Sequence, residues 1–420
     1  MKFLHAADIH LDSPLRGLER YEGAPVDEIR GATRKAFDRL IDFAISQGVD
    51  FVLIAGDIYD GDWKDYNTGL YFVGCMRKLE AAGIPVYLLA GNHDAASVIT
   101  RKLRLPDNVH TFSTRKAQTL LVDGLNVAIH GQGFATKAVT DDISQGYPQA
   151  DETLFNIGML HTCLDGKPGH DSYAPCTVDG LRSKGYQYWA LGHVHVREVV
   201  SSDPYIVFPG NIQGRHARET GPKGCTLVTV EDARVVSVEH HDLDVMRWMR
   251  CELDVSDCET PDAIHDQVHK ALQQSTDDAN DRALAVRLIL TGSTPAHAQL
   301  HNERDRWVSE YRSLASGLAG AGVWLEKVSL NTQAAVSEAD LLERDDALAE
   351  LMDSIGDIDL TDRALELYAE ELSPLRTKLP SSLLSGDDAY DPTHPDTIRL
   401  ALKDVKQLLL NRLLAKGQDA

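Results

Sequence analysis

Several features of common protein classes are missing from this 420-residue sequence. Its six cysteines form no CxxC pair and no regular framework, which excludes a disulfide scaffold and is typical of a reducing compartment. The first residues lack the basic stretch and apolar core of a signal peptide. No apolar run approaches the length needed to cross a bilayer. We therefore expect a cytoplasmic protein that does not contact membranes.

Basic residues are also scarce relative to acidic ones. The chain has 42 Lys+Arg and 64 Asp+Glu, a net charge of −22, and most of the excess acid lies after residue 240. This balance argues against broad electrostatic binding of nucleic acid but leaves room for a local basic track. A hydrophobic content of 43% is that of a globular protein, and the length predicts two or three domains.

Residues 1–242 alternate short apolar segments with helical stretches. The helical segments are Ala32–Gln47 and Leu70–Ala82, each followed by a glycine. This order predicts a layered α/β core. The predicted strands are Lys2–Ala6, Asp50–Ile54, Pro85–Leu89, Leu125–Ile129, Phe155–Leu160, Tyr188–Leu191, Tyr205–Phe208 and Cys225–Val230.

The pattern changes near residue 243. Residues 243–335 predict a small β-α-β-α-β domain with strands Arg247–Val255, Ala283–Leu290 and Val323–Leu330 and helices Pro261–Gln274 and Ala298–Leu318. Residues 336–420 are mostly helical and acidic, with a turn-rich linker at Leu379–Pro395. The last helix, Asp396–Lys416, has a broad apolar stripe.

Polar side chains follow five of the predicted strands directly. In open α/β sheets ligands bind at this edge, beyond the carboxyl ends of the strands. Taken singly, each cluster has a plain explanation: Asp57 as a turn residue, "GNHD" as a turn, His193 as a surface histidine. All five together favour a metal site. In chain order the clusters are Asp8, His10 and Asp12; Asp57; Asn92, His93 and Asp94; His161; and His193 and His195.

The ligand types narrow the chemistry. Carboxylates, imidazoles and one amide oxygen, without thiolate, suit Mn²⁺ better than a structural Zn²⁺. Seven ligands are too many for one ion and about right for two, which could clamp the attacking and leaving oxygens of a displacement at phosphorus. Gly56, Gly91 and Gly192 precede ligands, where a missing Cβ lets the chain turn sharply.

The series DxH, GD, GNHD, a lone His and GHxH resembles the calcineurin-like metallophosphoesterase superfamily. Within it, "HAADIHLDSP", "AGDIYDG" and "FPGNIQGR" resemble the SbcD/YhaO-type DNA repair exonucleases. The resemblance covers Phe3 to His241. It implies a four-layer α/β/β/α sandwich with a dimetal centre at one edge, followed by a small α/β capping domain and a helical C-terminal tail.

The resemblance also implies a role for each motif residue. Asp8, His10 and His195 would hold one ion, Asn92, His161 and His193 the second, and Asp57 would bridge both. His93 would stabilise the transition state or protonate the leaving oxygen, and Asp94 could orient His93. A metal-activated hydroxide would be the nucleophile, without a covalent intermediate.

Two positions depart from the family pattern. Many relatives have glycine where Asp12 stands, and some have histidine where Asp60 stands. Asp12 could turn the loop or hydrogen-bond His10 from outside the ligand set. His5 fits a buried structural group, or a hydrogen-bond donor behind the ligands, better than a ligand. Arg215, in "FPGNIQGRHARETGPKGC", belongs either to an exposed polar hairpin or to a contact with substrate phosphate, and the family's PG…R stretch favours the second.

The resemblance implies a Mn²⁺-dependent DNA exo- or endonuclease subunit of an SbcCD/YhaNO-like repair complex. Its partners would be DNA, an SbcC/YhaN-like coiled-coil ATPase bound through the C-terminal helices, and a second copy in a homodimer. The last helix could equally pack against its own domain. Two alternatives stay open: a phosphodiesterase for small nucleotides, and a mainly scaffolding subunit of the ATPase.

Overall fold

The computed structural model describes residues 1–13, 26–60, 66–96, 103–165, 173–318, 322–335, 361–379, 384, 390–402 and 405. The chain divides into two compact units. The first consists of Met1–Cys251, Leu272–Arg287 and Leu314–Lys327, and the second of Glu252–Ala271, Leu288–Ser313 and Val328–Ala420. Every residue that the sequence predicts for the metal centre lies in the first unit.

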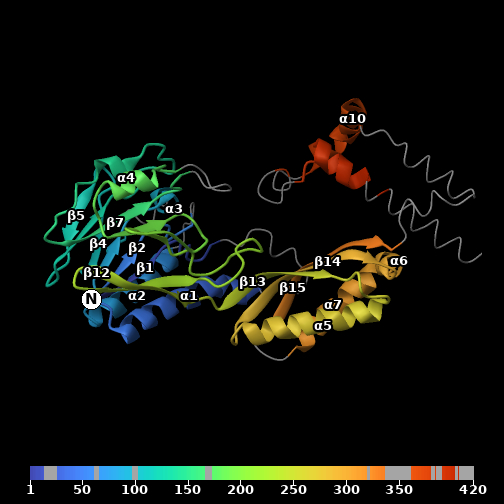
Figure 1. The fold of residues 1–420 in the computed structure, drawn as a ribbon, viewed down its shortest axis with the longest axis horizontal. Coiled ribbons are helices and arrows are strands. Elements are labelled where there is room, and N and C mark those ends of the chain that lie inside the picture. Colours follow the sequence, from blue (N-terminus) through green and yellow to red (C-terminus); the bar gives the residue numbers. More distant parts are fainter. Residues whose placement is uncertain are drawn as a thin grey trace, which may run out of the picture. The chain divides into compact units, whose positions relative to one another are not determined.

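The first unit contains two six-stranded sheets (Figure 1). One sheet has the order β12-β11-β1-β2-β3-β4. Its strands are β1 Lys2–Ala6, β2 Phe51–Ile54, β3 Val86–Leu88, β4 Val109–Thr111, β11 Gly224–Glu231 and β12 Arg234–Asp242. Strands β1 to β4 run parallel, with Phe3 opposite Phe51 and Val52 opposite Val86, whereas β11 is antiparallel to β1.

The other sheet has the order β5-β6-β7-β8-β10-β9. Its strands are β5 Gln118–Leu121, β6 Val127–Gly131, β7 Phe155–His161, β8 Tyr188–Gly192, β9 Glu198–Ser202 and β10 Tyr205–Phe208. The four central strands are parallel, and the two edge strands are antiparallel to their neighbours. Both sheets therefore present several strand carboxyl ends at one edge.

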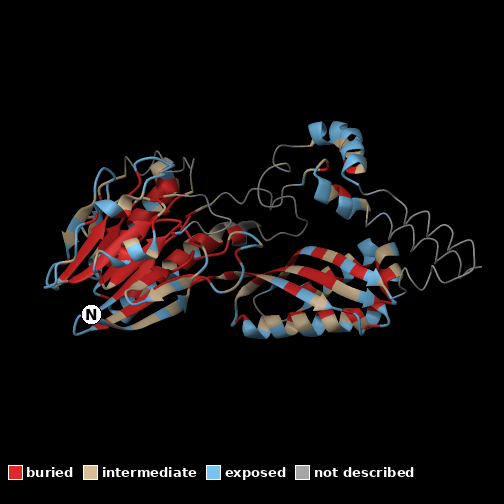
Figure 2. Ribbon diagram, turned by 45° about the horizontal axis from the view of Figure 1, so that its top comes forward, coloured by how far each residue is buried: buried red, intermediate tan, exposed pale blue. Residues whose placement is uncertain are grey.

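Alternating side chains build three core layers around these sheets. Phe3 and Phe51 of the first sheet pack with Ile157 and Tyr188 of the second, and the strands are largely buried (Figure 2). Helices α1 Val26–Gln47 and α2 Tyr66–Ala81 share a core with the outer face of the first sheet. The short helix α4 Val178–Arg182 and the 3₁₀ turn Ile143–Gly146 pack with the outer face of the second. The predicted four-layer α/β/β/α sandwich is confirmed, although its last layer is thin.

Some elements differ from the sequence prediction. Four strands were not expected from the sequence: β4, β5, β9 and β12. They are the edge strands of the two sheets, and most of their residues are half-exposed or exposed. Such strands carry a weak apolar signal because one face or one edge meets water. The predicted ligand Asn92 and the predicted acid His93 lie on a short helix, α3 Asn92–Ala96, for which the sequence also allowed a turn.

The next region contains the predicted three-stranded sheet, in the order β13-β14-β15. Its elements are β13 Met246–Asp254, α5 Pro261–Asp278, β14 Ala283–Thr294, α6 His297–Asn302, α7 Arg304–Gly317 and β15 Val323–Ala334. The prediction of one helix at Ala298–Leu318 was wrong. Glu303 leaves the helical region, with φ −110° and ψ 31°, and divides the segment into α6 and α7.

The C-terminal part is described only in places. Helix α10 spans Asp362–Lys378, and residues 395–402 are helical. Most of the predicted helix Asp396–Lys416 lies outside the described residues. Leu400 and Val405, two residues of its predicted apolar stripe, are exposed. Within the described ranges, none of the helices has both the length and the hydropathy to cross a membrane.

Candidate metal centre

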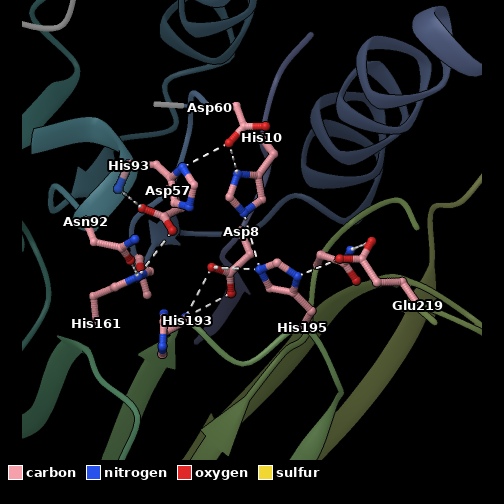
Figure 3. Close-up of polar contacts among 12 residues, drawn as sticks. Asp8, His10, Asp57, Asp60, Asn92, His93, His161, His193, His195 and Glu219 are labelled. Carbon is pink, nitrogen blue, oxygen red and sulfur yellow. Dashed lines mark hydrogen bonds and ion pairs between the residues drawn. The ribbon is translucent and has the colours of Figure 1, made fainter. Parts of the chain in front are cut away.

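The predicted ligands lie where the carboxyl ends of β1, β2, β3, β7 and β8 meet (Figure 3). Hydrogen bonds join the two sheets at this edge. The His193 amide donates to the Asp8 carboxylate at 3.0 and 3.1 Å, and His161 Nδ1 lies 2.9 Å from the Ala55 carbonyl oxygen. Residues far apart in sequence thus converge because parallel strands from both sheets end there.

One group consists of Asp8, His10 and His195, which offer ligand atoms that all lie within 4.8 Å of one another. The two Nε2 atoms of His10 and His195 are 3.3 Å apart. His195 Nδ1 lies 2.7 Å from Glu219 Oε1 and donates to this carboxylate, which leaves a lone pair on Nε2. That lone pair faces His10 and, at 3.9 Å, Asp8 Oδ1, as an ion bound between these groups would require.

A second group consists of Asp57, His161 and His193, also within 4.8 Å. His161 donates through Nδ1 to Ala55, so its Nε2 is available as a ligand. Nε2 lies 2.9 Å from Asn92 Oδ1 and 3.3 Å from Asp57 Oδ2. Burial alone would lower the pKa of His161, but the negative charges of Asp57 and Asp8 raise it to about 9. The carboxylates of Asp57 and Asp8 thus favour a positive charge beside His161, which fits a cation site.

Several candidate ligands have left-handed backbone conformations. The φ angles are +51° at Asp8, +45° at His10, +55° at Asp57 and +98° at His193. For residues other than glycine such angles are uncommon and carry a conformational cost that neighbouring contacts must offset. Their concentration at this edge indicates that these loop conformations are kept because they place the candidate ligand side chains.

Two glycines permit the close approach of these loops. A Cβ at Gly91 would lie 2.2 Å from Asp57 Oδ1, far inside contact distance. Gly56 has a φ of +97°, and its Cβ would lie 2.5 Å from His161 Nδ1. Both positions therefore require glycine, as expected from their places before ligands.

The carboxylate that faces His93 is Asp60. His93 Nδ1 lies 2.9 Å from Asp60 Oδ1, while the Asp94 carboxylate accepts backbone amides from Ile58, Tyr59 and Gly91 at 2.9–3.0 Å. The expected orientation of His93 by Asp94 is thus replaced by Asp60, and Asp94 instead holds the Asp57 loop. Burial alone would lower the pKa of His93, but the bond to Asp60 and the charge of Asp57 raise it.

Arg215 lies beside the first group but contacts carboxylates of the protein. Its Nη2 donates to Glu219 Oε1 at 3.2 Å, and its Nη1 is 3.6 Å from Asp60 Oδ2. The side chain is only 14% exposed. Sequence reasoning missed Glu219, whose spacing of four from Arg215 was the only available signal.

Asp12 and His5 are structural. The Asp12 carboxylate accepts hydrogen bonds from Arg34 of α1 through both oxygens and from the Thr68 hydroxyl of α2 at 2.5 Å, so it holds two helices to the loop. These bonds take the place of the predicted hydrogen bond to His10. His5 is fully buried, with its ring nitrogens 3.0 Å from the Tyr188 hydroxyl and the Leu191 carbonyl oxygen.

The chain matches two family models. Residues 1–197 match the calcineurin-like phosphoesterase model, and residues 248–333 match the middle domain of the metallophosphoesterase YhaO. The first match contains all of the candidate ligands, and the second covers the region of the three-stranded sheet.

Curated proteins of related sequence agree with these matches. The chain is 34% identical to the "Uncharacterized metallophosphoesterase YhaO" of Bacillus subtilis, over 70% of this chain and 72% of that protein. It is 22% identical to the "DNA double-strand break repair protein Mre11" of Sulfurisphaera tokodaii, over 70% and 74%. The Haloferax volcanii protein of the same name is 24% identical over 93% of this chain and 83% of its own length.

Proposed function

The chain belongs to the calcineurin-like metallophosphoesterase family, and from this premise we propose that it is a dinuclear, Mn²⁺-dependent phosphodiesterase that hydrolyses DNA. Three groups at this edge could hold an ion, and the two that contain the predicted carboxylate and histidine ligands carry the proposal; the third brings His93 together with His10 and Asp60. His93 lies next to the first group, with its ring centroid 5.0 Å from that of His10.

The residues present fit two divalent ions. Asp8, His10 and His195 would hold one, Asn92, His161 and His193 the other, and Asp57 would bridge them. Bound ions of this kind lower the pKa of water towards neutrality and neutralise charge on phosphate oxygens. Mn²⁺ is favoured because the donors are nitrogen and oxygen atoms without thiolate. All six cysteines are buried, and none forms a disulfide or belongs to the proposed ligand set.

The protein's own groups would orient the substrate and handle the proton. The Asp60 carboxylate lies 2.9 Å from His93 Nδ1 as an ion pair, and a proton on Nε2 would then serve the leaving oxygen of a phosphodiester. Asp94 accepts the Ile58 and Tyr59 amides of the Asp57 loop and the Gly91 amide of its own loop, and so joins the two loops. Asp94 is therefore proposed as a positioning residue, and His93 as the general acid.

DNA as substrate and a repair role rest on the Mre11-named relatives and on the sequence motifs. We further propose a cytoplasmic complex with an SbcC/YhaN-like coiled-coil ATPase bound through the C-terminal helices, in which the chain forms a homodimer. The three-part division 1–242, 243–335 and 336–420 belongs to this proposal and is supported by the family match at 248–333. Deleting Asp396–Ala420 should abolish co-purification with such an ATPase and leave phosphodiesterase activity intact; retained binding would refute this docking site.

One experiment separates the candidate functions. Purified protein is incubated with Mn²⁺ and either single-stranded DNA, double-stranded DNA or a bis-aryl phosphodiester dye, with His93→Ala as the control, in the presence and absence of the ATPase. We expect cleavage of DNA and dye that His93→Ala removes. Dye hydrolysis without DNA cleavage would support a small-nucleotide phosphodiesterase instead, and inactivity on every substrate would support a scaffold.

A further inference from the structure

Two histidines of the centre each face a carboxylate outside the proposed ligand set. His195 Nδ1 lies 2.7 Å from Glu219 Oε1, and His93 Nδ1 lies 2.9 Å from Asp60 Oδ1. The first histidine is a proposed metal ligand and the second the proposed acid. Their relative placement therefore depends on how these two carboxylates are held.

One side chain reaches both carboxylates. Arg215 donates through Nη2 to Glu219 at 3.2 Å and approaches Asp60 Oδ2 through Nη1 at 3.6 Å. Asp60 Oδ2 also accepts the Ser13 hydroxyl, which lies 3.5 Å from Arg215 Nη1. The planar guanidinium can serve two carboxylates at once, which the single ammonium group of a lysine does less well.

The Glu219 end of this link is rigid. Its Oε2 accepts the Asn211 side-chain amide at 2.9 Å and the backbone amide of Arg215 at 2.7 Å. Glu219 is 6% exposed, and both of its carboxylate oxygens are bonded, Oε1 to His195 Nδ1 and Arg215 Nη2 and Oε2 to the two amides. Any displacement of Arg215 therefore disturbs Glu219.

A direct contact of Arg215 with substrate phosphate, as expected from sequence, would have to compete with these bonds. The guanidinium is 14% exposed and lies between the buried carboxylate of Glu219 and the half-buried carboxylate of Asp60. Turning it towards a substrate would leave Glu219 and Asp60 without their shared cation, and uncompensated buried charge is costly.

Resting on the proposed phosphodiesterase function, we propose that Arg215 is a positioning residue that links the metal ligand His195 to the acid His93 through Glu219 and Asp60. Its loss loosens both histidines together. The ligand loses its fixed ring orientation, which weakens metal binding before any substrate arrives. The acid loses alignment, which slows the proton transfer.

The first test measures metal binding without substrate. Apo protein is titrated with Mn²⁺ by calorimetry for wild type, Arg215→Met and Glu219→Gln. Loss of partners that orient a metal-bound histidine costs about 10–100-fold in affinity, so we expect weaker binding at one of two sites by about tenfold or more in both variants. Arg218→Met is the matched control, because it removes the same charge from an exposed position in the same loop and should leave affinity unchanged.

The second test measures hydrolysis of the dye. A positioning role predicts a lower kcat with little change in KM for Arg215→Met. A phosphate contact predicts a raised KM with unchanged Mn²⁺ affinity, and this result would overturn the proposal. An equal effect of Arg218→Met would also overturn it, because net charge alone would then explain the loss.

A coupling measurement tests the link itself. Residues that act through one network have non-additive effects. We expect the effects of Asp60→Asn and Glu219→Gln on kcat to be non-additive in the wild-type background and additive when Arg215→Met is present. Additivity in both backgrounds would refute the link. If the protein lacks phosphodiesterase activity, the proposed function is wrong, and so is the part of this proposal that concerns the acid His93. The Mn²⁺ titrations still decide whether Arg215 fixes the ring of His195. Should Arg215→Met not fold, Glu219→Gln and Arg215→Lys, which keeps the charge but bridges poorly, replace it.

Discussion

The substitution Gly91→Ala probes the closeness of the ligand loops with a single methyl group. The new Cβ would lie 2.2 Å from Asp57 Oδ1 and 2.8 Å from the Asp57 amide nitrogen. Since non-bonded heavy atoms settle at more than 3 Å, the carboxylate must move by about 1 Å. Overpacking of this kind costs about 1–3 kcal/mol of folding stability. Because Asp57 is the proposed bridging ligand, the displacement should also weaken metal binding.

A displacement of about 1 Å at a reacting centre can lower the rate about 10²-fold. We therefore expect Gly91→Ala to bind Mn²⁺ at least about tenfold more weakly in calorimetry and to hydrolyse the phosphodiester dye about 10²-fold more slowly. Gly74→Ala is the matched control. It lies in the middle of α2 with nothing within 4 Å of the new Cβ, so it should stabilise the protein by about 0.5–1 kcal/mol and leave activity unchanged. Wild-type Mn²⁺ affinity in Gly91→Ala would refute the assignment of Asp57 as a ligand.

Three further predictions concern residues around the centre. His93→Ala should lower kcat for the dye by about 10²–10⁴-fold and leave Mn²⁺ affinity unchanged, because the residue transfers a proton and binds no ion; a parallel loss of affinity in calorimetry would contradict this role. Asp12→Asn should lower the free energy of unfolding in urea by about 1–3 kcal/mol, because the charged bonds from Arg34 and Thr68 are weakened; unchanged stability would show that the clamp is dispensable. Burial lowers the pKa of His5 from 6.5 to about 3. Between these two pH values His5 is protonated in the unfolded chain but neutral in the folded protein, so the free energy of unfolding falls as pH decreases. Relative to His5→Gln, wild type should lose up to about 1.4 kcal/mol per pH unit between pH 6 and pH 4, and parallel pH profiles would contradict the buried neutral state.

The convergence of the ligands could be predicted from sequence because strand polarity determines it. Apolar segments such as Phe51–Ile54 and Phe155–His161 are fully buried parallel strands, and the residues that end them share one edge. The number and type of polar residues at that edge then indicated two cations. No knowledge of loop geometry was needed for this step.

The partners of those ligands could not be predicted in the same way. Asp60 and Glu219 lie in loops, and their contacts with His93 and His195 depend on backbone paths with left-handed residues and close glycine contacts. Neighbours in sequence misled the prediction, since Asp94 follows His93 but its carboxylate accepts backbone amides of the adjoining loops. Arg215 likewise lies near the centre but faces carboxylates of the protein, which charge alone did not reveal.

The number of ions bound per chain, measured together with activity, tests the central claim most directly. Protein stripped with a chelator is titrated with Mn²⁺ while bound metal and hydrolysis of DNA and dye are followed in the same samples. Two ions per chain, with activity absent in the stripped protein and restored as the second ion binds, is the predicted result. Full activity in the stripped protein, or a single bound ion at saturation, would contradict a dinuclear phosphodiesterase.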